Sequence, residues 1–337
     1  MKLTVIGAGS FGTAMTRHVS TVSGGQNEVL LFCEQAAQAE AINRTHFNPN
    51  SMKEIELGAN VAAVGGAENF GRCLEFSDAI ILALPSQALG SVLEKVAHLS
   101  NGGRGLRLLS LAKGIEISSG LFMHQLAERH VPNAVYSALS GPSHAEEVAV
   151  GMPSAVVAAS RDQGAARMWQ GALNDERLRI YTSADVQGVE LGGSMKNVIA
   201  IAVGIARAMG FGDNSVAALV TRGLAEIMRY GASLGANSLT LAGLAGIGDL
   251  MVTCYSSLSR NFRFGAAIGG GKSADEACAE IGQVVEGMHT AKALALKARE
   301  AKLDLPISEG VYRIIYDRVP VKEVLTGLLL REPKPEM

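Results

Sequence analysis

The chain has 337 residues, which is about twice the length of a typical single domain and therefore predicts two domains. Hydrophobic residues make up 48% and charged residues 18%, with 39 glycines, a composition that fits a compact α/β protein and argues against extended disorder. Thirty basic against 32 acidic side chains leave a net charge of −2, so the chain as a whole does not attract nucleic acid or an anionic membrane.

The cysteines and the apolar segments bear on where the protein works. The four cysteines are widely spaced and form no C-x-x-C pair, which indicates free thiols in a reducing compartment. The N-terminus runs directly into the apolar residues 3–6 without the pattern of a signal peptide. The longest apolar stretch, residues 198–206, is half a membrane span and ends at Arg207. We therefore expect a cytoplasmic protein with no nucleic-acid partner and no stable membrane insertion.

The first half of the chain reads as alternating strands and helices. Residues 3–6 form an apolar run that breaks at Gly7, residues 13–22 contain no helix breaker, and residues 29–32 form a second apolar run. Further strand-like runs follow at 79–84, 106–111, 135–139, 154–159 and 178–181. This alternation predicts a Rossmann-like, doubly wound and mostly parallel sheet.

The second half has a different pattern. After about Asp185, long stretches rich in Ala, Leu, Ile and Met recur at helical spacing. They cover residues 189–210, 214–235, 273–282, 288–301, 306–317 and 320–329. We predict an α/β protein in which the N-terminal Rossmann-like sheet is followed by an all-helical C-terminal domain. The expected division is a Rossmann-like domain at 1–185, a helical domain at 186–332, and a tail at 333–337.

A glycine-rich loop lies between the first strand and the first helix. Gly7, Gly9 and Gly12 fit the pattern G-x-G-x-x-G, with Ser10 and Phe11 between the last two glycines. In this context the glycines allow the backbone to approach a pyrophosphate, and the helix N-terminus offers free N–H groups to it. The loop therefore predicts a dinucleotide site.

Glu34 bears on which dinucleotide is bound. It follows the second predicted strand, where an acidic residue accepts hydrogen bonds from the adenosine ribose of NAD. Its charge would repel the 2′-phosphate of NADP, so we expect NAD to be preferred. The alternative is an ordinary solvated glutamate at a strand end.

Further motifs follow in a fixed order. They are Lys-Gly-Ile-Glu at 113–116, Ser-Gly-Pro-Ser at 140–143, Gly-Gly-Ser-Met-Lys-Asn at 192–197, Gly-Ile-Gly-Asp-Leu at 246–250, Ser-Arg-Asn at 259–261 and Gly-Gln-Val-Val-Glu-Gly at 282–287. Together with the glycine loop, and nearly from end to end, the chain resembles bacterial-type glycerol-3-phosphate dehydrogenase. The resemblance implies interconversion of sn-glycerol 3-phosphate and dihydroxyacetone phosphate with NAD(H), a role in phospholipid synthesis, and a homodimer.

The resemblance also implies that Lys196 is the catalytic proton acceptor. Oxidation of a secondary alcohol needs a group that takes the hydroxyl proton, and an ordinary lysine is too basic for this unless burial or another cation lowers its pKa. Lys113 could supply that cation. Asp249 could orient Lys196 or a substrate hydroxyl, or it could simply cap the next helix. The alternative for Lys196 is a residue on a helix surface, which the apolar stretch that follows it argues against.

Other residues are assigned by the same resemblance. The implied substrate contacts are Lys113, Gly141, Ser143, Asp249, Ser259, Arg260 and Asn261. Arg260 suits a phosphate because a guanidinium donates two parallel hydrogen bonds. The implied cofactor contacts beyond the glycine loop and Glu34 are Lys113, Ala145, Arg260, Val284 and Glu286. Many members of the family carry a basic or neutral residue at position 34, so Glu34 sets this chain apart from them.

The histidines do not predict a metal site. His144 lies inside a motif and is interpreted as a pocket-lining residue rather than a general base. The other histidines have no partner at ligand spacing and are predicted at surface or helix positions: His18, His46, His98, His124, His130 and His289.

Three rival functions share this architecture. A β-hydroxyacid or 6-phosphogluconate dehydrogenase would also join a nucleotide-binding domain to a helical domain with a catalytic lysine, but the sequence offers no second clamp for a carboxylate. A related phosphate could be the substrate instead. A non-catalytic nicotinamide nucleotide sensor is a third possibility, which the presence of both Lys196 and Lys113 argues against.

Overall fold

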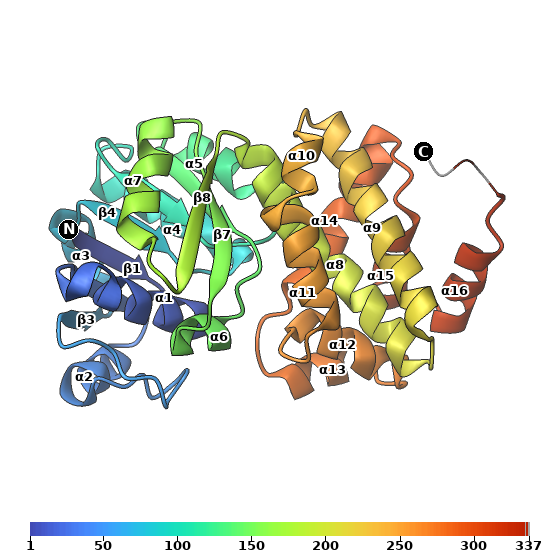
Figure 1. Ribbon diagram of the computed structural model, residues 1–337, viewed down its shortest axis with the longest axis horizontal. Coiled ribbons are helices and arrows are strands. Elements are labelled where there is room, and N and C mark those ends of the chain that lie inside the picture. Colours follow the sequence, from blue (N-terminus) through green and yellow to red (C-terminus); the bar gives the residue numbers. More distant parts are fainter. Residues whose placement is uncertain (334, 336–337) are drawn as a thin grey trace.

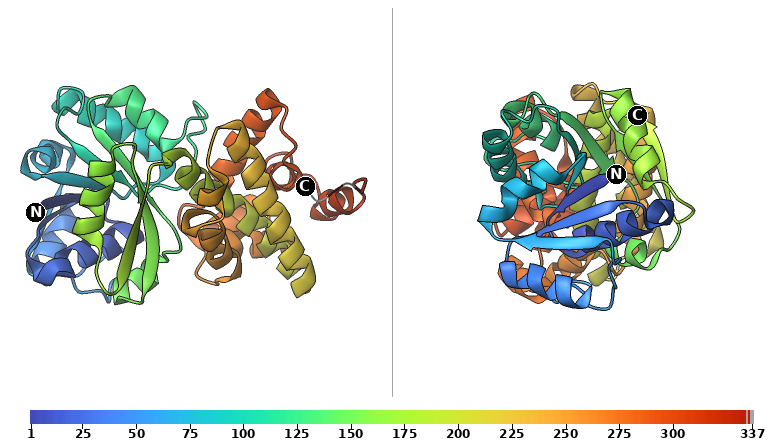
Figure 2. Two further views of the ribbon diagram at one scale, coloured as in Figure 1. Left: turned by 45° about the horizontal axis from the view of Figure 1, so that its top comes forward. Right: turned by 90° about the vertical axis from the view of Figure 1, so that its left-hand side faces the viewer.

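The computed structural model describes residues 1–333 and residue 335. Its N-terminal half is a sheet covered by helices, and its C-terminal half is helical and lies beside it (Figure 1). Of the tail predicted at 333–337, residues 334, 336 and 337 lie outside the described residues. The last helix, α16 (Val321–Leu329), lies at the end of the helical half farthest from the sheet (Figures 1 and 2).

The sheet has eight strands in the order β3-β2-β1-β4-β5-β6-β7-β8. The strands are β1 (Lys2–Ile6), β2 (Glu28–Cys33), β3 (Val61–Gly65), β4 (Ala79–Leu82), β5 (Arg107–Ser110), β6 (Val135–Ser140), β7 (Ser154–Ala159) and β8 (Leu178–Ser183). All neighbouring pairs are parallel except β6 with β7. The strand order reverses beside β1, and in open α/β sheets ligands bind at the carboxyl ends of the strands at such a point.

Helices cover the sheet between its strands. They are α1 (Ser10–Thr21), α2 (Ala36–Thr45), α3 (Phe70–Phe76), α4 (Ser86–Leu99), α5 (Met123–His130), α6 (Ala145–Val150) and α7 (Gln163–Leu173). One apolar cluster packs α1, α2 and α7 against the strands, and a second packs α3, α4 and α5 against them. The Rossmann-like, mostly parallel sheet predicted from the sequence is confirmed.

The prediction missed strand β3. Its sequence, Val-Ala-Ala-Val-Gly, is short and contains two alanines, which are weak strand formers. The strand forms because it pairs with β2 over five residues, from Val29 with Val61 to Cys33 with Gly65. Hydrogen bonding to the edge strand β2 therefore stabilises a strand that its local sequence propensity does not predict.

The helical half contains α8 (Val186–Ala208), α9 (Asp213–Ser233), α10 (Ser238–Leu241), a π-helical segment at Leu244–Gly248, α11 (Asp249–Tyr255), α12 (Arg260–Gly269), α13 (Ala274–Ile281), α14 (Glu286–Ala301), α15 (Pro306–Ile315) and α16. The helical C-terminal region is as predicted. Helices α11 and α12 were not predicted as helices, because residues 246–261 were interpreted only as binding motifs. Both begin at residues of those motifs, Asp249 and Arg260.

Helix α8 is the core of the helical half, and α9, α11, α12 and α14 pack around it. Nearly all of its residues are buried. Two helical stretches, Val186–Ala208 and Ser238–Tyr255, have the length and composition of a membrane span. In the first, 94% of the apolar window is buried within the protein, as in a core helix, and the second is divided into α10, the π-helical segment and α11.

Glycines let α8 approach its neighbours unusually closely. A Cβ at Gly204 of α8 would lie 2.1 Å from the carbonyl oxygen of Phe262, and one at Gly265 of α12 would lie 2.0 Å from that of Ile201. A Cβ at Gly287 of α14 would lie 2.6 Å from the carbonyl oxygen of Asn197. Backbones therefore meet directly where α8 crosses α12 and α14, and no larger residue fits at these crossings.

Candidate active site

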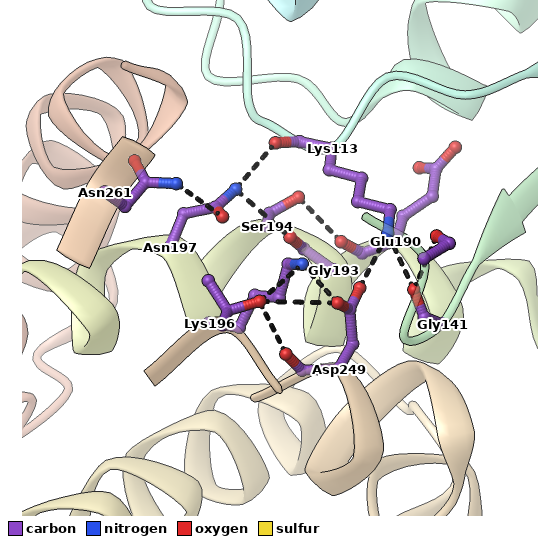
Figure 3. A network of polar contacts seen from close by, with 11 residues as sticks. Lys113, Gly141, Glu190, Gly193, Ser194, Lys196, Asn197, Asp249 and Asn261 are labelled. Carbon is purple, nitrogen blue, oxygen red and sulfur yellow. Dashed lines mark hydrogen bonds and ion pairs between the residues drawn. The ribbon is translucent and has the colours of Figure 1, made fainter. Parts of the chain in front are cut away.

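Four segments that are distant in sequence meet where the sheet joins the helical half. Lys113 lies three residues after β5, and Gly141 directly follows β6. Lys196 lies in the middle of α8, and Asp249 is the first residue of α11. Parallel strands end at the same edge of a sheet, so β5 and β6 deliver their following residues to α8 and α11. Figure 3 shows the resulting polar network.

Asp249 binds both lysines. Its Oδ2 accepts a hydrogen bond from Lys113 Nζ at 2.7 Å, and its Oδ1 accepts one from Lys196 Nζ (Figure 3). Burial alone would raise the pKa of Asp249, which is 1% exposed, but Lys113 and Lys196 outweigh burial and lower the pKa below its ordinary value. The N-cap of α11 is Gly248, and the Asp249 carboxylate faces the lysines, so the helix-capping alternative for Asp249 is not what the structure shows.

Lys196 is a buried lysine with a weakened affinity for its proton. Burial lowers its pKa from 10.5 to about 8, with Asp249 opposing the change and Lys113 adding to it. Its Nζ also donates to Thr253 Oγ1 at 2.9 Å. Thr253 lies one helical turn after Asp249 and donates in turn to the Asp249 carbonyl oxygen at 2.6 Å. Thr253 was not predicted as a site residue, although its spacing of four residues from Asp249 could have indicated it.

Asparagines connect this centre to the start of α14. Asn197 Nδ2 donates to the Lys113 carbonyl oxygen at 3.2 Å, and Asn261 Nδ2 donates to Asn197 Oδ1 at 2.8 Å. The backbone N–H of Gly287 donates to Asn261 Oδ1 at 2.9 Å. Asn197 was part of a recognised motif but was not assigned a role. It holds Lys113 and Asn261 in a fixed relation.

Arg260 and Ser259 stand at the N-terminus of α12. Ser259 is the N-cap, and its hydroxyl accepts from the Phe262 N–H at 3.2 Å. Arg260 is exposed, and the carboxylates of Glu286 and Glu146 interact with it electrostatically. A helix N-terminus with an arginine on its first turn attracts an anion through the free N–H groups and the guanidinium together.

The glycine loop follows β1 at the point where the strand order reverses. Gly7 has a φ of +110°, and a Cβ there would lie 2.4 Å from the carbonyl oxygen of Ala83 after β4. A Cβ at Gly12 would collide with the Gly7 carbonyl oxygen. A Cβ at Gly9, the N-cap of α1, meets no atom of the described residues within 4 Å. Two glycines thus shape the turn, while the third leaves the helix N-terminus open, as a pyrophosphate requires.

The remaining predicted cofactor residues, and the predicted substrate residue Ser143, differ in their exposure. Ser10 and Phe11 begin α1 and are half-buried, and Ala145 begins α6. Glu34 is exposed directly after β2. Val284 is 38% exposed just before α14. The half-buried Ser143 donates its hydroxyl to the Gly141 carbonyl oxygen at 2.9 Å.

Glu286 links the two halves of the molecule. Its carboxylate accepts a hydrogen bond from the Ser86 N–H at 2.8 Å and a second from the Ser86 hydroxyl. Ser86 is buried and begins α4, just past the carboxyl end of β4. A Cβ at Gly114 would lie 2.8 Å from the Glu286 carboxylate, so Lys113 is followed by a glycine for lack of space. Ser86 belongs to none of the sequence motifs and was not predicted as a site residue.

A second buried network anchors α8 to the sheet. Glu190 of α8 accepts from the His124 N–H at 3.0 Å and from Tyr136 Oη at 2.6 Å, and its Oε2 lies 2.6 Å from His124 Nδ1. The carboxylate thereby caps the N-terminus of α5. His124 was expected at a surface or helix position. It does lie on a helix, but it is 3% exposed, because Glu190 satisfies its polar groups in the interior.

Two other histidines, His144 and His18, are also largely shielded from solvent, and neither belongs to a metal site among the described residues. His144 precedes α6, and burial together with the charge of Lys196 lowers its pKa. His18 lies on α1, in agreement with the expected surface or helix position, and is 6% exposed, with its Nε2 lying 2.7 Å from the Leu173 carbonyl oxygen. Within residues 1–333 and 335, no group of three or more His, Cys, Asp and Glu side chains is arranged to hold a metal ion.

Comparison with known proteins gives consistent matches along the whole chain. The family profile described as NAD-dependent glycerol-3-phosphate dehydrogenase N-terminus matches residues 2–166, and the corresponding C-terminus profile matches residues 185–326. The glycerol-3-phosphate dehydrogenase [NAD(P)+] of Staphylococcus aureus is 39% identical over 338 residues, covering 99% of both chains.

Solved structures of glycerol-3-phosphate dehydrogenases also superimpose on nearly the whole chain. The glycerol-3-phosphate dehydrogenase of Coxiella burnetii superimposes with a TM-score of 0.92 at 31% identity, covering 98% of this chain and 99% of that one. The enzyme of the same name from Saccharomyces cerevisiae gives a TM-score of 0.81 at 25% identity, covering 97% of this chain and 98% of that one.

Proposed function

Because the chain belongs to the NAD-dependent glycerol-3-phosphate dehydrogenase family, and is thus an oxidoreductase that interconverts sn-glycerol 3-phosphate and dihydroxyacetone phosphate, we propose that Lys196 is its catalytic base and acid. The observation that carries this proposal is the shared carboxylate: Asp249 lies between Lys196 and Lys113, in a place where burial lowers the pKa of Lys196 to about 8. A lysine with that pKa can both accept and return a proton near neutral pH.

In the oxidation direction, neutral Lys196 accepts the proton of the substrate hydroxyl. Lys113 remains beside the reacting oxygen and stabilises the negative charge that develops on it. Asp249 holds both ammonium groups in position and keeps their charges balanced when Lys196 becomes protonated. In the reduction direction, protonated Lys196 returns the proton to the oxygen of dihydroxyacetone phosphate.

The phosphate of the substrate is held by Arg260 at the N-terminus of α12. A guanidinium donates two parallel hydrogen bonds to an oxyanion, and the helix N-terminus adds a partial positive charge. Asn261 adds an amide to the same turn, although its Nδ2 already donates to Asn197. The glycines that bring α12 against α8 fix Arg260 relative to Lys196.

A nicotinamide dinucleotide supplies the hydride acceptor or donor when it is bound. The open N-terminus of α1 at Gly9 fits its pyrophosphate, and Ser10 and Phe11 flank that position. Glu34 would accept hydrogen bonds from the adenosine ribose, and its charge would oppose a 2′-phosphate. We therefore assign NAD as the preferred cofactor, with the sheet half at 1–185 holding it and the helical half at 186–332 supplying the base.

The family membership supports a proposal for the biological setting. The product glycerol 3-phosphate would supply phospholipid synthesis, and the enzyme would work in the cytoplasm as a homodimer.

A spectrophotometric assay with the purified protein tests the proposal. Dihydroxyacetone phosphate should be reduced with NADH, whereas 2-keto and 3-keto acids should not. Lys196→Ala should lower kcat by about 10²- to 10⁴-fold, the range for a removed general base, while NADH still binds. A turnover of Lys196→Ala close to that of the parent would show that another group carries the proton.

A further inference from the structure

Asn48 is a buried polar residue outside every motif of the sequence. It lies in the connection between α2 and β3 and is 0% exposed. Within this connection, the loop at residues 46–57 is closed at its base by pairing between Phe47 and Glu56 and by a hydrogen bond from the Leu57 N–H to the His46 carbonyl oxygen. A polar side chain is rarely buried completely without a specific set of partners.

Asn48 makes all four hydrogen bonds that its carboxamide allows. Its Nδ2 donates to the Ala8 carbonyl oxygen at 2.8 Å and to Thr13 Oγ1 at 2.7 Å. Its Oδ1 accepts from Gln38 Nε2 at 2.8 Å and from the Asn50 N–H at 3.0 Å. One side chain therefore ties together the glycine loop, α1, α2 and its own connection.

The bond to Ala8 sets the orientation of one peptide in the glycine loop. The Ala8 carbonyl also accepts from Gln38 Nε2 at 3.3 Å, so two donors hold it in place. A trans peptide has its C=O and N–H on opposite sides, so this carbonyl orientation turns the N–H of Gly9 away from Asn48. A Cβ built on Gly9 meets no described atom within 4 Å, so the loop is open at this residue.

A second contact joins the same connection to the loop. Ser51 Oγ lies 3.0 Å from Ser10 Oγ, at the first residue of α1. The connection from α2 to β3 thus supports both the turn of the glycine loop and the start of the helix that follows it.

We infer that Asn48 is a positioning residue for the nicotinamide dinucleotide, which holds the Ala8 to Gly9 peptide in the orientation that the pyrophosphate requires. This inference rests on the proposed cofactor site at the glycine loop. Asn48 contributes to cofactor affinity through the loop and leaves the proton transfer at Lys196 unaffected.

Asn48→Asp tests the inference, because it keeps the shape and replaces the two donors with an acceptor that repels the Ala8 carbonyl. Kd for NADH and for NADPH is measured by titration calorimetry without substrate, and kcat and KM are measured with dihydroxyacetone phosphate. We expect Kd and KM for the dinucleotide to rise by about tenfold or more, with kcat and KM for dihydroxyacetone phosphate within about twofold of the parent.

Asn60→Asp is the matched control. Asn60 Nδ2 donates to the carbonyl oxygens of Ser20, Gly25 and Asn27 at 2.9, 3.2 and 2.7 Å, beside the amino ends of β2 and β3. The same chemical change there should lower the melting temperature without changing Kd for the dinucleotide. A loss of affinity equal to that of Asn48→Asp would overturn the inference, because affinity would then follow general stability.

The remaining outcomes also decide the matter. A parent that binds neither nucleotide would overturn the proposed cofactor site and this inference with it. A parent that binds, together with a folded Asn48→Asp of unchanged Kd, would overturn the inference alone. If Asn48→Asp does not fold, the milder Gln38→Ala, which removes one donor to Asn48 and one to Ala8, should raise Kd by about two- to fivefold. An unchanged Kd in Gln38→Ala would then overturn the inference.

Discussion

Replacing Lys113 by methionine should shift the pH at which glycerol 3-phosphate oxidation becomes fast. The proposed base Lys196 must be neutral to accept a proton. Burial lowers its pKa to about 8, Asp249 opposes that effect, and the positive charge of Lys113 assists it. Lys113→Met keeps an unbranched side chain but removes the charge, so the pKa of Lys196 should rise and less of the base should be neutral at a given pH.

The size of the effect follows from the pKa of Lys196. With the ordinary pKa of 10.5, about 0.1% of the lysine would be neutral at about pH 7.5, whereas a pKa of about 8 leaves about 24% neutral. Lys113 lies 2.7 Å from the carboxylate that also binds Lys196, so we expect its removal to raise the pKa of Lys196 by about one unit, the lower end of the range for a charged neighbour. Below the inflection, each unit costs about tenfold in neutral base.

The assay is kcat/KM for both directions between about pH 6.5 and 10. Oxidation requires neutral Lys196, so its rate should rise through an inflection near pH 8, and reduction requires protonated Lys196, so its rate should fall there. Lys113→Met should move both inflections upward, and Lys113→Arg, which keeps the charge, should leave them near pH 8. Inflections that stay in place in Lys113→Met, or move equally in both variants, would refute the coupling between the two lysines.

Three further predictions concern other parts of the site. Arg260→Lys should raise KM for dihydroxyacetone phosphate by about tenfold, because an ammonium cannot donate a bidentate pair, and unchanged kcat and KM would exclude Arg260 as the phosphate ligand. The parent should prefer NADH over NADPH by about tenfold in kcat/KM, and Glu34→Arg should narrow or reverse this ratio; equal efficiencies in the parent would mean that Glu34 is only a solvated strand-end residue. Glu190→Gln should lower the free energy of unfolding in urea by about 1–3 kcal/mol, because one amide oxygen cannot replace a carboxylate that accepts from both His124 and Tyr136, and a loss below about 0.5 kcal/mol would contradict that role.

The parts of the fold that the sequence predicted correctly share a physical basis. Alternating apolar runs indicated the strands, and the predicted strands at 3–6, 106–111 and 135–139 end just before Gly7, Lys113 and Gly141. That Lys113 and Lys196 meet at one carboxylate could not be derived this way, because Lys113 and Asp249 are 136 positions apart and their meeting depends on how α8 and α11 pack on the sheet. Only the resemblance to a family brought them together beforehand.

The residues that escaped prediction lack a local signal. Asn48 lies in an ordinary-looking connection and Ser86 is the first residue of α4, and the importance of both comes from partners far away in sequence, such as Ala8 for Asn48 and Glu286 for Ser86. Helix α12 was hidden because its first residues were interpreted as ligands, although Ser259 is also an N-cap that a pattern of helix starts would detect. One residue can therefore be a candidate ligand and also begin a helix. Interpreting such a position only as a ligand leaves the helix start unpredicted.

The glycine crossings of α8 with α12 have a consequence for how this enzyme selects its substrate. Main chain touches main chain there, so the separation between α8, which bears Lys196, and α12, which bears Arg260, is set by atoms that have no rotamers to adjust. The separation between the proposed base and the proposed phosphate ligand is therefore fixed by backbone packing. With these proposed roles, a molecule with one carbon more or less between its hydroxyl and its phosphate should fit the pair of side chains less well than glycerol 3-phosphate does.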